Sequence, residues 1–260
     1  YSDEQTISTD ETGIFYGMGP KHQYVPPSAD RAVNPEGDEK VRFTSLESGS
    51  AKGRMLPSMH IIKCDAKTPN DLRRTRVIHN LHKQHGFCSE DGWDLGEWQM
   101  TLTLEKTVNR EKVRYDVTYY RPYIMHRTKY TLVTCQMKAW MDTAGVAMWA
   151  ELPLGPYVKD KLGGKAIVIW DNCGPHNVPA LREIFTRINV KTENLPPNMT
   201  DTLQVMDLVV NAPLKAGIRR KRCDSLFEYF QTFRLQRMKE LSKPASQRNA
   251  LTEFKPPGQA

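Results

Sequence analysis

The stretch Lys165-Ala-Ile-Val-Ile-Trp170, followed directly by Asp171-Asn172, indicates most about the fold of this sequence. Its apolar residues run without the polar alternation of a half-exposed strand. Such a short, unbroken apolar run is typical of a strand buried on both faces. The stretch therefore predicts a buried strand with a carboxylate at its carboxyl end.

The segments after this strand alternate between helix and strand patterns. The sequence predicts a helix over Val178–Arg187, a short strand over Ile188–Leu195, and a long helical stretch from Met206 to about Leu241. Before the strand, Asp142 is expected to be the N-cap of a helix that runs through Leu154. Alternating units of this kind indicate an α/β layered domain.

The first half of the sequence is expected to consist mainly of strands. Asn109-Arg110-Glu111 is expected to be the turn of a hairpin, and three strands near the front suggest an antiparallel meander. The expected front strands are Gln5–Met18, Val41–Ser48 and Met55–Lys63, and the hairpin strands are Trp98–Val108 and Lys112–Tyr120.

Composition excludes several classes of protein. Hydrophobic residues make up 39% of the 260 positions, which is too much for a disordered chain. The five cysteines are odd in number and form no C-x-x-C pair, which argues against a disulfide framework and for a reducing compartment. No segment approaches the roughly 18 apolar residues that span a bilayer. The net charge of +7 is compatible with a polyanionic partner.

Three aspartates stand where their carboxylates can converge. Asp10 lies in the middle of the first strand, Asp171 closes the buried strand, and Asp207 begins the long helix. Converging carboxylates repel one another unless a hard cation such as Mg²⁺ neutralises them. Two such cations can support hydrolysis or transfer at a phosphodiester. Taken singly, each aspartate is more often a helix cap or a turn residue.

The sequence around each aspartate adds a resemblance. Asp10-Glu-Thr-Gly13, Asp171-Asn-Cys-Gly-Pro-His-Asn177, and Leu195-Pro-Pro-Asn-Met-Thr200 with Leu203-Gln-Val-Met-Asp207 look like the three signature blocks of the DDE superfamily endonucleases. The most similar branch is the pogo/Tigger group of mariner-type transposases, with its centromere-binding and jerky-like domesticated relatives. The similarity covers residues 1–20 and 130–225, and the blocks occur in the family's order.

The resemblance implies a ribonuclease-H-like mixed sheet flanked by helices, with Asp10, Asp171 and Asp207 as catalytic residues and ligands of two Mg²⁺ or Mn²⁺ ions. It implies DNA cleavage and strand transfer on transposon ends and target DNA, a nuclear location and a possible homodimer. Asn172, His176 and Gln204 match positions that we expect to orient the metal ligands or the substrate.

The resemblance also suggests how the chain is divided. Residues 1–64 and 128–241 are expected to form the catalytic core, 242–260 a loose tail, and 65–127 a β-rich insertion between the first two acids. The interval of 161 positions between Asp10 and Asp171 is wider than the family usually shows. Family members normally carry N-terminal helix-turn-helix domains, and we expect that sequence-specific reader to be missing here.

A basic cluster follows the third aspartate on the predicted long helix. Such a cluster can track DNA phosphates, although a charge run is as often a solvated helical face. Its members are Lys215, Arg219, Arg220, Lys221 and Arg222. The alternative function is therefore a domesticated, catalytically inactive DNA-binding protein of the same fold. A ribonuclease or structure-specific nuclease is a weaker alternative.

Overall fold

The apolar run that follows Lys165 forms strand β7 (Ala166–Trp170) in the computed structural model, as predicted. The structure describes residues 1–16, 42–67, 72, 75–83, 92–108, 110–196 and 203–248. The chain divides into two compact units, Tyr1–Ile14 with Val41–Ala212, and Phe15–Lys40 with Pro213–Ala260. The first unit carries the sheet and all three aspartates.

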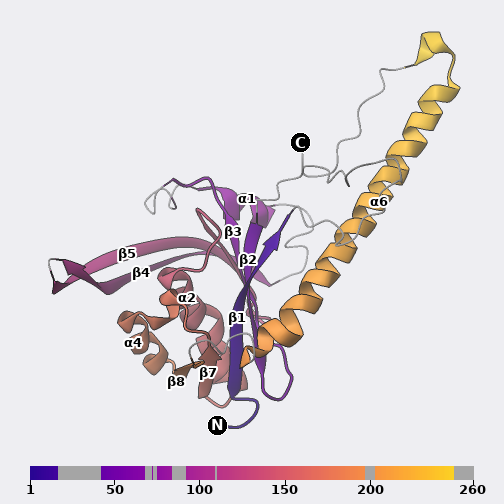
Figure 1. Cartoon of the computed structure of the whole chain (residues 1–260). Coiled ribbons are helices and arrows are strands. Elements are labelled where there is room, and N and C mark those ends of the chain that lie inside the picture. The colour runs from indigo at the N-terminus through magenta and orange to yellow at the C-terminus, as the bar shows by residue number, and fades with distance from the viewer. Residues whose placement is uncertain are drawn as a thin grey trace. The chain divides into compact units, whose positions relative to one another are not determined.

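Within the described residues, one mixed sheet has eight strands in the order β4-β5-β6-β3-β2-β1-β7-β8 (Figure 1). Strands β1, β7 and β8 run parallel to one another, and β3 is parallel to β6. The β2–β3, β4–β5 and β5–β6 pairs are antiparallel. The remaining strands are β1 (Thr6–Phe15), β2 (Arg42–Ser50), β3 (Met59–Lys63), β4 (Trp93–Val108), β5 (Glu111–His126), β6 (Leu132–Gln136) and β8 (Val190–Asn194).

Helices flank this sheet because its inner strands are apolar on both faces. Ile61 and Leu132 pack in the main core, which includes residues of α2, α3 and α4. Ile62 and Val133, the next residues along their strands, pack in a second cluster with α1. Successive strand residues point to opposite faces. The arrangement is consistent with a ribonuclease-H-like fold. The helices are α1 (Val77–Lys83), α2 (Thr143–Trp149), α3 (Gly155–Lys161) and α4 (Pro179–Arg187).

The helix predicted from Asp142 to Leu154 begins as expected and continues further. The Asp142 carboxylate accepts a hydrogen bond from the backbone N–H of Gly145 at 2.9 Å and is the N-cap of α2. A wider π-helical turn, η2 (Ala150–Leu154), contains Pro153 and leads into α3. Proline lacks the backbone N–H of a regular helix. The wider turn lets the chain pass Pro153 and remain helical to Lys161.

The predicted hairpin is present, and it is longer than expected. Its turn pairs Val108 with Glu111, and the inner end of β5 hydrogen-bonds to β6 from Tyr123 to Met125. The side chain of Trp98 on β4 is buried in the main core. Much of the 65–127 range is thus built into the central sheet, while its origin as an insertion stays a prediction.

The second unit contains most of the long helix α6 (Ala212–Ser242), which has no buried residue within its described length. The helix ends close to the predicted Leu241 and is followed by the short 3₁₀ turn η5 (Ala245–Gln247). Residues 249–260 of the predicted loose tail lie outside the described residues. No helix in the described part of the chain is sufficiently long and apolar to cross a membrane.

Candidate metal centre

Asp10 occupies an interior position of the sheet. Its strand, β1, lies between β2 and β7, and Asp10 is only 7% exposed. Burial raises the pKa of the Asp10 carboxyl to about 7, and the nearby carboxylates of Asp207, Glu11 and Asp171 raise it further in the same direction. A pKa raised in this way means that the site favours the neutral form of the Asp10 carboxyl, or a cation bound beside its charged form.

Asp171 follows the carboxyl end of β7, the parallel neighbour of β1. The register pairs Ser8 with Ile169, so two further steps along both strands bring Asp10 level with Asp171. Adjacent strands lie about 4.8 Å apart. The hydrogen bond to His176 is the main cause of a lowered pKa at Asp171, and burial opposes it. Asp171 therefore lies one strand away from Asp10 at the same level of the sheet, and the pKa shifts of the two acids are opposite.

His176 joins two carboxylates from different strands. Its Nδ1 lies 3.0 Å from Asp171 Oδ1, and its Nε2 lies 2.8 Å from Glu11 Oε1. The ring stacks on Trp170 with centroids 4.4 Å apart and planes 10° apart. Burial disfavours its charged form, but the hydrogen bonds to Asp171 and Glu11 outweigh burial and raise the His176 pKa to about 10. His176 is thus a fixed cation beside the acids at neutral pH.

Asp207 lies on a π-helical turn, η4 (Met206–Asn211), and is exposed. Asn211 on the same turn is buried, and its Nδ2 donates to Asp207 Oδ1 at 2.9 Å and to Asp10 Oδ2 at 2.8 Å. One amide group therefore connects the acid of β1 with the acid of η4. Since Asp207 is exposed while Asp10 is buried, the pair opens to solvent on the Asp207 side.

Gln204 holds the segment before η4 against β1. Its buried side chain donates from Nε2 to the Thr9 carbonyl at 3.2 Å and accepts from Ser8 Oγ at 3.3 Å. Gln204 therefore contacts the strand that carries Asp10, one residue away from the acid itself. Asn172 similarly ties a loop, donating to the Leu195 carbonyl at 3.4 Å. Of the three predicted supporting residues, His176 is the one that contacts carboxylates directly within the described part of the chain.

Two residues at this site, Glu11 and Asn211, were not predicted as site residues from the sequence. Glu11 directly follows Asp10, and Asn211 lies four positions after Asp207, so both had a neighbouring acid as a signal. Alternation along β1 predicts that Glu11 and Asp10 point to opposite faces. Contact with His176 explains how Glu11 nevertheless joins the same network.

Comparison with known families adds a finding independent of this geometry. The profile of the family described as DDE superfamily endonuclease matches residues 114–253, more than half of the chain. The chain belongs to the DDE superfamily endonucleases. No curated protein and no solved structure matches it significantly.

The match to the DDE superfamily endonucleases covers two of the three aspartates. The matched residues include Asp171 and Asp207, whereas Asp10 lies ahead of them. Asp10 is joined to the matched part by its hydrogen bond from Asn211. The match also begins at Arg114, so family-like sequence starts within the range expected to be an insertion.

The side chains at this site suit a hard divalent cation. Asp10, Asp171 and Asp207 offer carboxylate oxygens, which Mg²⁺ and Mn²⁺ prefer. Burial and the nearby carboxylates raise the pKa of Asp10, and a cation between these acids would reduce their repulsion. Among the described residues, the group that brings its ligand atoms within 4.8 Å of one another is Glu11, Asp171 and His176, and the three aspartates do not form such a group. Both nitrogens of His176 already face carboxylates, so the aspartate oxygens are the better ligands.

The predicted basic cluster lies on the first turns of α6, in the second unit of the DDE endonuclease. Arg220 and Lys221 are exposed, and Lys215, Arg219 and Arg222 are partly exposed. The last three recur at helical spacings of four and three, so they share one face of α6. They are therefore accessible to a polyanion along one side of the helix.

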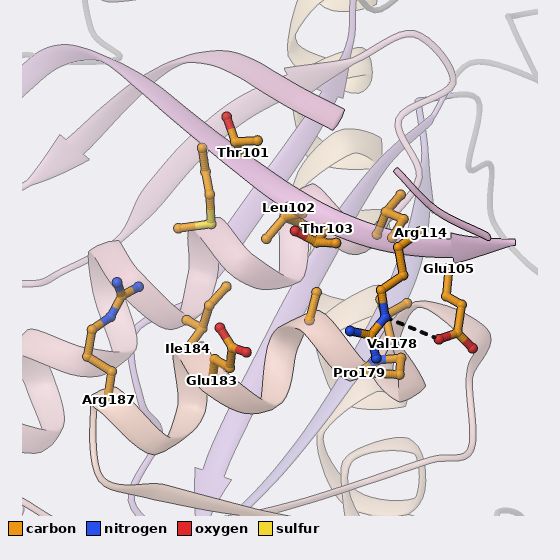
Figure 2. A pocket seen from close by; sticks show the side chains of 13 residues that line it. Thr101, Leu102, Thr103, Glu105, Arg114, Val178, Pro179, Glu183, Ile184 and Arg187 are labelled. Atoms are coloured by element: carbon orange, nitrogen blue, oxygen red, sulfur yellow. Dashed lines mark ion pairs between the residues drawn. The ribbon is translucent and has the colours of Figure 1, made fainter. Parts of the chain in front are cut away.

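A well-formed hollow lies away from the aspartates. It has a volume of about 540 Å³ and lies between β4 and α4, with Arg114 and Glu105 forming an ion pair at its rim (Figure 2). None of the predicted catalytic residues lines it. Glu183 and Arg187 add charges of both signs, so it lacks the convergent acids of a metal centre. Another hollow of about 500 Å³ is lined by His176 and Trp170, but none of Asp10, Asp171 and Asp207 lines it.

Proposed function

We propose that this chain is the catalytic core of a cut-and-paste DNA transposase of the pogo/Tigger type. Asp10, Asp171 and Asp207 would hold two divalent cations, Mg²⁺ or Mn²⁺. The observation that carries the proposal is the meeting of Asp10 and Asp207 through one amide group, beside Asp171 on the adjacent strand. Bound cations would activate a water or a 3′-hydroxyl and stabilise the leaving oxygen at a phosphodiester.

The protein's own residues have separate parts in this proposal. His176 holds Asp171 ionised and fixes its direction, while Gln204 keeps η4 against β1. Exposure of Asp207 leaves the acids open to a DNA strand. The basic face of α6 is proposed to contact phosphates, which positions DNA without reading its sequence. A nuclear location and action as a homodimer on paired ends belong to the same proposal.

The alternative is a catalytically inactive DNA-binding protein of transposase origin. An enzyme needs all three acids in reach of one cation pair, whereas a binder can lose that arrangement without loss of binding. The close approach of Asp10 to Asp207 favours the enzyme.

The test is nicking of supercoiled plasmid DNA in Mn²⁺ or Mg²⁺, with DNA binding measured in parallel in EDTA. Wild-type protein is expected to convert plasmid to the nicked form, and Asp171→Asn is expected to bind DNA normally without nicking it. Asp3→Asn is the matched control, because Asp3 is exposed and precedes β1, outside the acidic site. Nicking that survives Asp171→Asn would remove the assignment, and binding without nicking by the wild type would favour the inactive alternative.

A further inference from the structure

Asn211 is a buried polar side chain in direct contact with two acids. It is 2% exposed, and its Nδ2 lies 2.8 Å from Asp10 Oδ2 and 2.9 Å from Asp207 Oδ1. A primary amide nitrogen carries two hydrogens. One hydrogen therefore goes to each carboxylate, and the amide must present its nitrogen, because a carbonyl oxygen would repel both acids.

The contact with Asn211 uses Oδ2 of Asp10 and Oδ1 of Asp207. The Asp10 carboxyl is also hydrogen-bonded to Asp207, so the two acids face each other directly. Mg²⁺ and Mn²⁺ in proteins are commonly held by single oxygens of several carboxylates. The amide holds one oxygen of each acid in place and thereby sets the direction in which the other oxygen of that acid points.

The backbone around Asn211 supports this role. Asp207 and Asn211 belong to the same π-helical turn, and such turns occur frequently at functional sites. Asn211 Oδ1 is buried and has no hydrogen-bond partner among the described residues. An unpaired buried carbonyl oxygen costs stability, which a hydrophobic residue at this position would avoid. The amide's contribution is therefore its two N–H bonds to the acids.

We propose that Asn211 is a positioning residue that preorganises Asp10 and Asp207 for divalent cation binding. The inference rests on the proposed function, since it assumes that these acids hold the cations. Groups that orient metal ligands typically contribute 10- to 100-fold to metal affinity. A side chain at position 211 that donates two hydrogen bonds should give the full gain in metal affinity. A side chain with one donor should give part of that gain, and a side chain with no donor should give none.

The test is a graded series at position 211, read out by Mn²⁺ affinity from the electron paramagnetic resonance signal of free Mn²⁺. Asn211→Ser keeps one donor, and Asn211→Leu keeps similar volume with none. We expect Mn²⁺ to bind roughly 10- to 100-fold more weakly to Asn211→Leu, with Asn211→Ser between it and the wild type. Asn80→Leu is the matched control, because Asn80 is exposed on α1.

The outcomes separate this inference from the proposed function. Equal Mn²⁺ affinity across folded variants, with binding still lost in Asp171→Asn, would overturn the role of Asn211 and leave the metal site standing. If Asn211→Leu fails to fold by circular dichroism, Asn211→Ser decides, and wild-type affinity in that variant overturns the inference. Absence of Mn²⁺ binding to the wild type would overturn both.

Discussion

Replacement of Asp10 by asparagine should stabilise the metal-free protein at alkaline pH, although it removes a proposed catalytic acid. The Asp10 carboxyl has a pKa of about 7 in the folded chain against 3.8 as the ordinary value. The folded state therefore binds more protons than the unfolded state between these values, and stability falls as pH rises through them. Between pH 5 and pH 8 the Asp10 carboxyl should lower the free energy of unfolding of the wild type by at most roughly 3 kcal/mol.

The assay is urea unfolding of wild type and Asp10→Asn in EDTA across this pH range. The pKa of His176, raised to about 10, lowers the stability of both proteins above about pH 6.5, so the difference between them isolates Asp10. Saturating Mn²⁺ should stabilise the wild type and not the variant, by about 2.7 kcal/mol at a hundred times the Kd. Parallel pH profiles for the two proteins would refute the reasoning.

Three further substitutions test other contacts. Asp142→Ala should lower the free energy of unfolding by about 3–5 kcal/mol, because it removes the partner of buried Arg121 and the cap of α2; Asp142→Asn, which can still cap but has no charge, should lose less, and no loss at all in that variant would count against the ion pair. Gln204→Leu should cost roughly 1–3 kcal/mol in urea unfolding, because the buried Thr9 carbonyl loses its donor, and no change would contradict that contact. Arg219→Gln should reduce the slope of log affinity for duplex DNA against log salt by about one, and an unchanged slope would place Arg219 off the DNA.

Local pattern predicted the elements around the site well. The apolar run Ala166–Trp170 became β7, and Asp142 became the N-cap of α2, because both depend on residues close together in the sequence. The continuation of that helix past Leu154 to Lys161 was not predicted, since a wider turn around Pro153 depends on packing.

The partners of the acids depended on the order of the strands. Sequence spacing indicated that Asp10, Asp171 and Asp207 can converge, but it did not indicate that Asn211 links two of them or that Glu11 reaches His176. Those contacts follow from β1 lying directly beside β7 and from η4 packing on β1. These contacts join residues that lie far apart in the sequence, so the periodicity of a single helix or strand cannot predict them.

The separation of Asp10 from its partners also has a consequence for synthesis on the ribosome. Asn211 follows Asp10 by 201 positions, which corresponds to roughly 10–40 s of translation at about 5–20 residues per second. For most of that interval β1 has neither β7 nor η4 available, although it becomes an inner strand of the finished sheet. An unpaired strand edge of this kind is a site where chains aggregate. Of the two neighbours of β1 in the sheet, β2 is therefore the one that can cover it before β7 is made.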